Sequence, residues 1–459
     1  MLDKKVLSLD ELAFKVAREI RPGNVVAVGH GMADVIGKRL SSAPDAWIID
    51  GYGGLISTHG ASKSSKDKQG SSFHGVSDVA SIMHGGHVDI AIVEAGEITA
   101  SGDIVSLSTL STAGLLAPGW SVDLLDNPRR VIAVAKHFNS MGESVLKSNC
   151  TVNPDGIGCV DMIITDIAVL EIGDNGFVLK ELVDGWDIDD LTADGSIHIE
   201  SSQSITDGEV DKEEETELSK LYDTGVAAMS DLPDGATVMI DGFAGPGGMP
   251  HYLLVSLRDH GAKELTIIGN TAGIARVVNF GTPAGKQAID HTLLIDNGQV
   301  SKAVASYPVS PSASRPTAFE LAYRRGDVEL ELVPQGTLAE RLRSGGAGIS
   351  AFFTPTGVGT LIAEGKQSRI IKGKEYILEK GLRADFCIIR GYKADKLGNV
   401  IYKGTSRNFN PVMAPAADIT IVEVDEVVEV GTLEPDEIVT PGIYIDRIVI
   451  RPKDFSPYE

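Results

Sequence analysis

One plan of strands, turns and helices occurs twice along the chain. PGNVVAV, the glycine-rich turn GHGMAD, a helix and the strand AWIID follow one another in the first half. DGATVMI, the turn DGFAGPGGMP, the helix HYLLVSLRDHG and the strand LTIIGN do so in the second. Further on, Asp89 stands as far from the turn glycine Gly102 as Asp385 does from Gly398. Hydrophobic strands that alternate with helices predict an α/β fold of two related domains, with mainly parallel sheets covered by helices.

The boundary between these halves is marked by composition. Residues 197–218 are polar, acidic and free of aromatic side chains, so they cannot bury enough apolar surface to fold alone. A chain of 459 residues is also too long for one ordinary hydrophobic core. We therefore expect domains at 1–196 and 219–459, joined by an acidic linker. A duplicated binding module without chemistry is the alternative.

Charge and cysteine content exclude several classes of protein. A formal net charge of −23 disfavours nucleic acids and anionic membranes as partners. No apolar run reaches the roughly 18 residues of a membrane span, and the N-terminus reads as an amphipathic helix with Leu12, Val16 and Ile20 on one face. Three scattered cysteines predict neither disulfides nor zinc, and HExxH, CxxC and GxGxxG patterns are absent. These features predict a cytoplasmic protein without a metal or nucleotide redox cofactor.

The second half carries motifs of a known family. Asp241, Gly242 and Phe243, followed by Gly247 and Pro250, resemble a family signature that begins with two glycines, one of which is replaced here by Asp241. ELVPQGTLAERLRSGGAGISAFFTPTGVGT and RNFNPVMAPAADITIVEV also match long family segments. This half resembles the A-type subunit of family I CoA-transferases, the group of succinyl-CoA:3-oxoacid and acetoacetate CoA-transferases.

The first half resembles the B-type subunit of the same family. The resemblance rests on IMHGGHVDIAIVEAG and NCTVNPDGIGCVDMIITDIAVLEI. It implies fused subunits, with the B-type half first, and a homodimer. It also implies an acyl-CoA thioester as substrate, with coenzyme A as its carrier and a carboxylate as a further partner.

The catalytic glutamate that the resemblance implies is missing. In the family a Glu at a strand end of the B-type domain attacks the thioester carbonyl. The corresponding segment here is WIIDGYGGLIS, which places Tyr52 at that position, or Asp50 after a shift of two residues. Asp50 is a substitute nucleophile under one hypothesis and a turn-supporting residue under the other.

Two other carboxylates stand close by in sequence. Glu94 and Glu97 occupy positions where the transferases carry Gly and Gln. A buried Glu in a cleft can have a pKa near neutrality and act as a general base on water or on a carbon acid. The alternative is that both are hydrated at a strand end. His74 and His30 are further acid/base candidates, for which a surface position is the alternative.

The remaining candidates belong to the family's oxyanion and CoA-binding segments. The resemblance implies that glycine-rich turns and one asparagine line the thioester, whereas turn formation and turn capping are the alternatives. These residues are Gly242, Phe243, Gly247, Gly248, Asn270, Gly345, Gly346 and Gly348. Arg341, Arg343 and Lys302 are candidate phosphate contacts, or else surface cations of helices.

Three functions follow from these residues. Because the nucleophilic Glu is missing, we expect cleavage of a thioester or a carbon–carbon bond in the acyl-CoA of a small oxo or carboxylic acid. A genuine 3-oxoacid CoA-transferase that uses Asp50 is the second hypothesis. A catalytically silent CoA-binding protein is the third.

Overall fold

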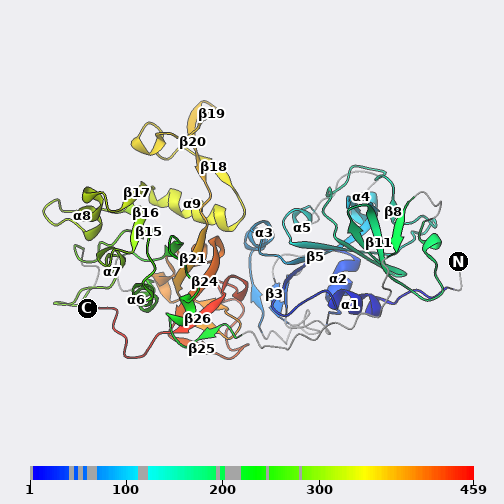
Figure 1. Ribbon diagram of the computed structural model, residues 1–459, viewed down its shortest axis with the longest axis horizontal. Coiled ribbons are helices and arrows are strands. Elements are labelled where there is room, and N and C mark those ends of the chain that lie inside the picture. Colours follow the sequence, from blue (N-terminus) through cyan, green and yellow to red (C-terminus); the bar gives the residue numbers. More distant parts are fainter. Residues whose placement is uncertain are drawn as a thin grey trace. The chain divides into compact units, whose positions relative to one another are not determined.

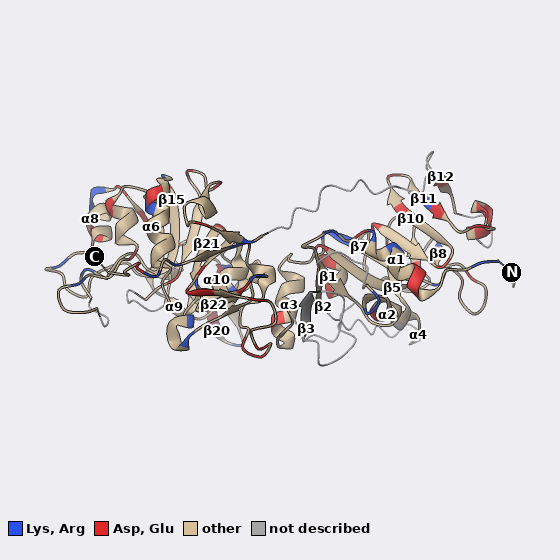
Figure 2. Ribbon diagram, turned by 90° about the horizontal axis from the view of Figure 1, so that it is seen from below, with Lys and Arg blue, Asp and Glu red and all other residues tan. Residues whose placement is uncertain are grey.

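The structure is a computed structural model that describes residues 4–40, 46–49, 55–58, 70–111, 122–192, 197–201, 219–243, 248–278 and 282–458. The chain separates into two compact units, Met1–Leu218 (unit 1) and Ser219–Glu459 (unit 2). Each is a mixed α/β structure (Figure 1). Asp and Glu are spread over both units, with Lys and Arg among them (Figure 2). Among the described residues, no helix has the length and apolar character that crossing a bilayer requires.

Unit 1 is built on one large sheet with the order β12-β11-β10-β9-β7-β5-β1-β2-β3-β4. Neighbouring strands from β9 to β2 run parallel, whereas those at both ends of the sheet are mostly antiparallel. The strands are β1 (Val25–Val28), β2 (Trp47–Ile49), β3 (Leu55–Thr58), β4 (Ser72–Phe73), β5 (Ile90–Thr99), β6 (Ile104–Ser106), β7 (Arg130–Ala135), β8 (Leu146–Lys147), β9 (Met162–Thr165), β10 (Ala168–Gly173), β11 (Gly176–Leu182) and β12 (Ile199–Ser201).

Helices cover this sheet. They are α1 (Leu9–Ala17), α2 (Met32–Gly37), α3 (Val76–His84), α4 (Leu107–Ser111) and α5 (Asp123–Asp126). α1 begins at Ser8, whose hydroxyl accepts the N–H of Glu11 while the Glu11 carboxylate accepts the N–H of Ser8. Leu12, Val16 and Ile20 are buried, as their spacing predicts. They join α2 in one core against β1, β5, β7 and β9.

Unit 2 contains a sheet in which all neighbouring strands are parallel, in the order β13-β26-β24-β21-β14-β15-β16-β17. Its strands are β13 (Leu221–Tyr222), β14 (Thr237–Ile240), β15 (Leu265–Thr271), β16 (Val300–Tyr307), β17 (Glu329–Leu332), β21 (Ala384–Arg390), β24 (Ala417–Val424) and β26 (Arg447–Ile450). The expected α/β class with mainly parallel sheets is confirmed.

Both faces of this sheet are buried. Val238 and Ile240 of β14 belong to one core, with α6 (His251–His260), α7 (Thr292–Asp296) and α8 (Ala318–Arg325). Met239, between them, belongs to the opposite core, with α9 (Gln335–Gly346) and α10 (Asn410–Met413). Alternate side chains therefore enter different cores, which explains why the strand sequence is continuously apolar.

Two small sheets complete unit 2. β18 (Ala351–Thr354), β19 (Ser368–Ile371) and β20 (Lys374–Lys380) form an antiparallel sheet that projects beyond α9 (Figure 1). β22 (Lys393–Asp395), β23 (Val400–Ile401) and β25 (Glu426–Val428) form the other. Of the segment expected as a linker, Ile199–Ser201 pair with β11 as strand β12, and residues 202–218 lie outside the described residues.

Candidate functional site

Glu94 lies where the pairing of β5 with its parallel neighbours β1 and β7 ends. The pairing of β5 with β1 extends to Ile92 opposite Val28, and its pairing with β7 extends to Glu94 opposite Val134. The glycine-rich turn after β1 comes to the same edge, where the Met32 N–H donates to Glu94 Oε2 over 3.1 Å. The carboxyl edge of a parallel sheet is where α/β proteins bind ligands. Glu94 therefore occupies a position suited to chemistry.

A glycine makes room for this carboxylate. Gly31 has a φ of +72°, and a Cβ built on it would lie 1.9 Å from Glu94 Oε2. A side chain at position 31 would therefore displace the carboxylate as well as strain the backbone. The position of the Glu94 carboxylate therefore depends on the turn GHGMAD.

The surroundings of Glu94 make its carboxylate more basic than that of a hydrated glutamate. The side chain is half-buried, and this burial raises the pKa of Glu94 above its usual range. The Met32 N–H and the charge of Lys136 act in the opposite direction but do not cancel the effect. A carboxylate with a raised pKa is a better proton acceptor near neutral pH.

Glu97 has a different environment, although it is only three positions away. It is 4% exposed, its Oε2 accepts the Thr151 N–H over 2.8 Å, and its Oε1 accepts the Thr151 hydroxyl over 2.6 Å. Burial, together with the charge of Glu97, raises the pKa of Cys150 to about 11. Because Thr151 occupies both oxygens, we infer that Glu97 holds the 150–151 segment against β5.

The other candidates of unit 1 are placed as follows. His74 is half-buried with its Nε2 2.9 Å from Ser72 Oγ, and burial lowers the pKa of His74. His30 is exposed in the turn after β1. Asp50 and Tyr52 lie outside the described residues.

In unit 2, Asp241 follows β14 directly and is fully buried. Its Oδ1 accepts the Gly242 N–H over 2.6 Å, and its Oδ2 accepts the N–H groups of Phe409 and Asn410, each over 3.0 Å. The Phe243 ring stacks on that of Phe409, with centroids 5.5 Å apart. The Gly242 N–H is therefore already occupied in this structure. Sequence reasoning noted Asp241 only as a departure from a glycine pair and missed these contacts.

The other end of this glycine-rich segment, at Gly248, also contacts the segment around Asn410. Asn410 Nδ2 donates to the Gly248 carbonyl over 3.0 Å, and a Cβ at Gly248 would lie 2.2 Å from Asn408 Nδ2. Gly242 is equally confined, since a Cβ there would lie 2.2 Å from Met249 Cε. Gly247 lies outside the described residues.

Asn270 lies near the carboxyl end of β15 and is 1% exposed. Its Oδ1 has no hydrogen-bond partner within the described part of the chain, and the same holds for the hydroxyls of Thr271 and Ser306 at the ends of β15 and β16. Buried polar atoms normally have a partner, so these three acceptors are suited to a water or a polar ligand.

The second glycine-rich candidate is largely helical. Gly345 and Gly346 are the last two residues of α9, and Gly348, with a φ of +69°, follows its end. A Cβ at Gly345 would lie 1.8 Å from the Leu382 carbonyl oxygen, and one at Gly346 would lie 3.0 Å from Pro415. These two glycines therefore allow close packing of α9.

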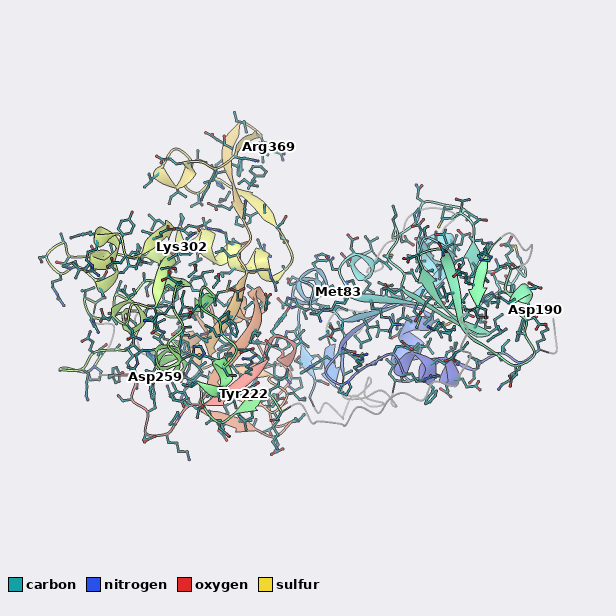
Figure 3. The ribbon with its side chains drawn as sticks, viewed as in Figure 1. Met83, Asp190, Tyr222, Asp259, Lys302 and Arg369 are labelled. Carbon is teal, nitrogen blue, oxygen red and sulfur yellow. The ribbon has the colours of Figure 1, made fainter. Side chains whose placement is uncertain are left out.

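The candidate cations each have a carboxylate partner. Arg341 is buried and bonds Glu331 over 2.6 Å, while the exposed Arg343 bonds Glu340 over 2.9 Å. Lys302 of β16, labelled in Figure 3, lies 3.5 Å from Glu331. To bind a phosphate group, these cations would have to exchange their carboxylate partners for it.

The chain is similar to known CoA-transferases. The family model for coenzyme A transferase matches residues 222–451. A 3-oxoadipate CoA-transferase subunit of Pseudomonas putida is 45% identical over 232 residues, which are 50% of this chain and 94% of that protein. A probable succinyl-CoA:3-ketoacid coenzyme A transferase subunit of Bacillus subtilis is 43% identical and covers 51% of this chain and 90% of its own length. The mouse mitochondrial succinyl-CoA:3-ketoacid coenzyme A transferase 2A is 41% identical over 251 residues, 45% of its length.

Solved structures of similar proteins were also found. An acyl-CoA transferase from Escherichia coli O157:H7 has a TM-score of 0.45 and 21% identity, and covers 52% of this chain and 48% of that one. The glutaconate coenzyme A-transferase of Acidaminococcus fermentans has a TM-score of 0.43 and 19% identity, and covers 51% of this chain and 76% of that one.

Proposed function

Because the chain belongs to the coenzyme A transferase family, we propose that it cleaves the acyl-CoA thioester of a small oxo or carboxylic acid, with Glu94 as the reactive carboxylate. The observation that carries this proposal is the position of Glu94 at the carboxyl edge of the β5 region, half-buried and with a raised pKa. The segment expected to supply the family's nucleophile reads WIIDGYGGLIS and contains no Glu. Glu94 supplies a carboxylate from β5, which is separated from β2 of that segment by β1.

In this proposal Glu94 acts as a general base. Its carboxylate takes a proton from water as the water oxygen attacks the thioester carbonyl, which becomes a tetrahedral oxyanion. Collapse of the oxyanion breaks the carbon–sulfur bond, and the CoA thiolate takes the proton back from Glu94. With a 3-oxoacyl substrate, attack at the ketone followed by carbon–carbon cleavage balances in the same way, with the proton passing to the α-carbon.

Unit 2 has polar side chains of its own that suit a polar ligand. Asn270 Oδ1 and Ser306 Oγ, on one face of two parallel strands, and Thr271 Oγ1, on the other face, are unpartnered acceptors within the described residues. As hydroxyls, Thr271 and Ser306 can also donate to a carbonyl. A polar acyl group is the ligand chemistry that these atoms suit.

Transfer of CoA between carboxylates, with Asp50 as nucleophile, is the second candidate. It is favoured by the relatives named above, which are described as 3-oxoadipate and succinyl-CoA:3-ketoacid transferase subunits. In that reaction Asp50 displaces CoA thiolate from the donor to form an anhydride, and the thiolate then attacks the Asp50 carbonyl, which releases the donor carboxylate and leaves an enzyme thioester. The acceptor carboxylate repeats these two steps in reverse, so that it leaves as the new acyl-CoA and Asp50 is freed.

One experiment separates the two reactions. Purified full-length protein is mixed with a panel of short acyl-CoA and 3-oxoacyl-CoA thioesters, with and without carboxylate acceptors, and all CoA species are followed by mass spectrometry. Free CoA or a shortened acyl-CoA without acceptor supports cleavage. A new acyl-CoA that forms only with acceptor overturns cleavage in favour of transfer, and binding without any change in the CoA species means a silent CoA-binding protein.

The homodimer, the cytoplasmic location and the absence of a metal cofactor are proposals of the same kind. The mass of the protein in solution, measured by light scattering after size-exclusion chromatography, tests the first. Unchanged turnover after treatment with a chelator supports the last.

A further inference from the structure

The glycine-rich segment after β14 is held at both described ends by one other segment. Asp241 joins its beginning to the N–H groups of Phe409 and Asn410, which lie 168 and 169 positions away in sequence. Asn410 joins its other end by donating from Nδ2 to the Gly248 carbonyl over 3.0 Å. Residues 408–410 therefore contact both described ends of the glycine-rich segment.

A carboxyl group suits this position because both of the side-chain atoms that face the donors are oxygens, which can accept hydrogen bonds. Three backbone N–H groups donate to the two oxygens of Asp241, one to Oδ1 and two to Oδ2. A carboxamide of the same shape would have to turn an NH2 group toward one of these donors. The side chain is 0% exposed, so water cannot replace a lost acceptor without a structural change.

We propose that Asp241 is a positioning residue that fixes Gly242, Phe243 and Gly248 against residues 408–410, and that this bridge sets how tightly unit 2 binds the acyl-CoA. The functional half of this inference rests on the proposed function, whereas the bridge itself does not. The family signature has a glycine at this position, so the bridge is a feature of this chain's own sequence.

Among the titratable groups described next to Asp241, Asp241 is the one that ionises near neutral pH. The charge of Asp241 acts on Cys387 of β21 and on Tyr402 after β23. Burial raises the pKa of Cys387 and the pKa of Tyr402 far above neutrality, so both stay neutral, and the charge of Arg407 only partly opposes the shift in the pKa of Tyr402.

The bridge should weaken as pH rises. Burial raises the pKa of Asp241 from its ordinary 3.8 to about 8, although the three N–H groups act in the opposite direction. If the bridge opened, the hydrated carboxylate would return toward the ordinary pKa of 3.8. Protons therefore bind more tightly to the closed form, so closure is most favoured below about pH 3.8, weakens as pH rises from about 3.8 to about 8, and changes no further above about pH 8.

Hydrogen–deuterium exchange of the full chain tests the bridge without any substrate. In the wild type the peptide 405–413 should be protected, and Asp241→Asn should lower the protection of its Phe409 and Asn410 amides about tenfold or more. Asp395→Asn is the matched control, because Asp395 is also buried and accepts two backbone N–H groups, from Leu397 and Asn399. It should leave 405–413 unchanged.

Protection within β24 must be retained in Asp241→Asn, which shows that unit 2 is folded. If the variant is unfolded, the wild type alone is decisive. Its protection in 405–413, corrected for the intrinsic exchange rate at each pH, should fall as pH rises toward about 8 and level off above it. Equal protection of 405–413 in the wild type and Asp241→Asn overturns the bridge, as does a flat wild-type profile.

The functional half is tested through acyl-CoA binding. The wild-type KM for the acyl-CoA substrate should rise as pH increases toward about 8 and level off above it, and in Asp241→Asn it should be raised about tenfold relative to the wild type at low pH, with kcat changed less. If Asp241→Asn differs from the wild type in the exchange of 405–413 but not in KM, the bridge exists but does not control acyl-CoA binding. No turnover by the wild type with any thioester points instead to failure of the proposed function.

Discussion

Glu94 accepts a hydrogen bond from the Met32 N–H, 3.1 Å from its Oε2, and so links the carboxyl edge of β5 to the turn after β1. This bond holds the carboxylate in one orientation without neutralising it, because a backbone N–H carries no proton that it can give up. A fixed, half-buried carboxylate with a raised pKa is what a general base requires.

Gly31 should be essential to this arrangement. Gly31→Ala places a methyl group 1.9 Å from Glu94 Oε2 and should lower turnover about 100-fold by displacing the carboxylate. Gly86→Ala is the matched control, since Gly86 has a similar φ of +76° and an added Cβ would have no neighbour within 4 Å. Gly86→Ala should lose about 1 kcal/mol of unfolding free energy, and Gly31→Ala, with a φ of 72° and a ψ of −129°, should lose at least as much. Equal turnover in the two would contradict the role of Gly31.

Glu423 should be a major contributor to the stability of unit 2. Its Oε2 accepts the N–H groups of Tyr252 and Leu253 at the start of α6, and its side chain is 0% exposed. Glu423→Ala leaves both donors buried without an acceptor and should cost about 3 kcal/mol in urea unfolding.

The matched control for Glu423 is a carboxylate at the surface. The Glu426 side chain is 54% exposed and bonds Lys393 over 2.7 Å. Glu426→Ala should cost less than about 1 kcal/mol, as is usual for exposed ion pairs. A similar loss of stability in the two variants would be inconsistent with Glu423 capping α6.

Lys220 should make stability depend on alkaline pH. Its Nζ donates to the Gly442 carbonyl over 2.7 Å, and burial lowers the pKa of Lys220 from 10.5 to about 8. Between these two values the unfolded chain binds the proton more fully, so the free energy of unfolding should rise as pH increases from about 8 to 10.5. The difference between the wild type and Lys220→Met, followed by urea unfolding across this range, should show that rise. A constant difference would mean that Lys220 is not desolvated.

The sequence predicts the parallel strands at the centre of each sheet, but it predicts fewer of the strands at the edges. Apolar runs such as VVAV and VIAVA are buried on both faces, as parallel strands require. The antiparallel pair β10 and β11 turns at Asp174 and Asn175 before Gly176, a common hairpin signal that was not used.

The site was less accessible to sequence reasoning. Glu94 and Glu97 look equivalent in IVEAGEITASGD, but a register shift between Ala95 and Glu97 in the β5–β6 pairing gives them different surroundings. Asp241 contacts residues more than 160 positions away, and no local pattern records such a contact. The environments of these side chains are decided by packing between segments that are distant in sequence. The spacing of residues along the chain does not encode that packing.

The central claim is that Glu94 is the reactive carboxylate. Glu94→Gln retains an oxygen that can accept the Met32 N–H, so the fold and the melting temperature should change little. Glu171→Gln, at a surface carboxylate of β10 that pairs with Lys180, is the matched control. The measurement is kcat/KM for release of CoA or of a shortened acyl-CoA. We predict a loss of about 100- to 10,000-fold in Glu94→Gln alone, and a value within about threefold of the wild type would contradict the account.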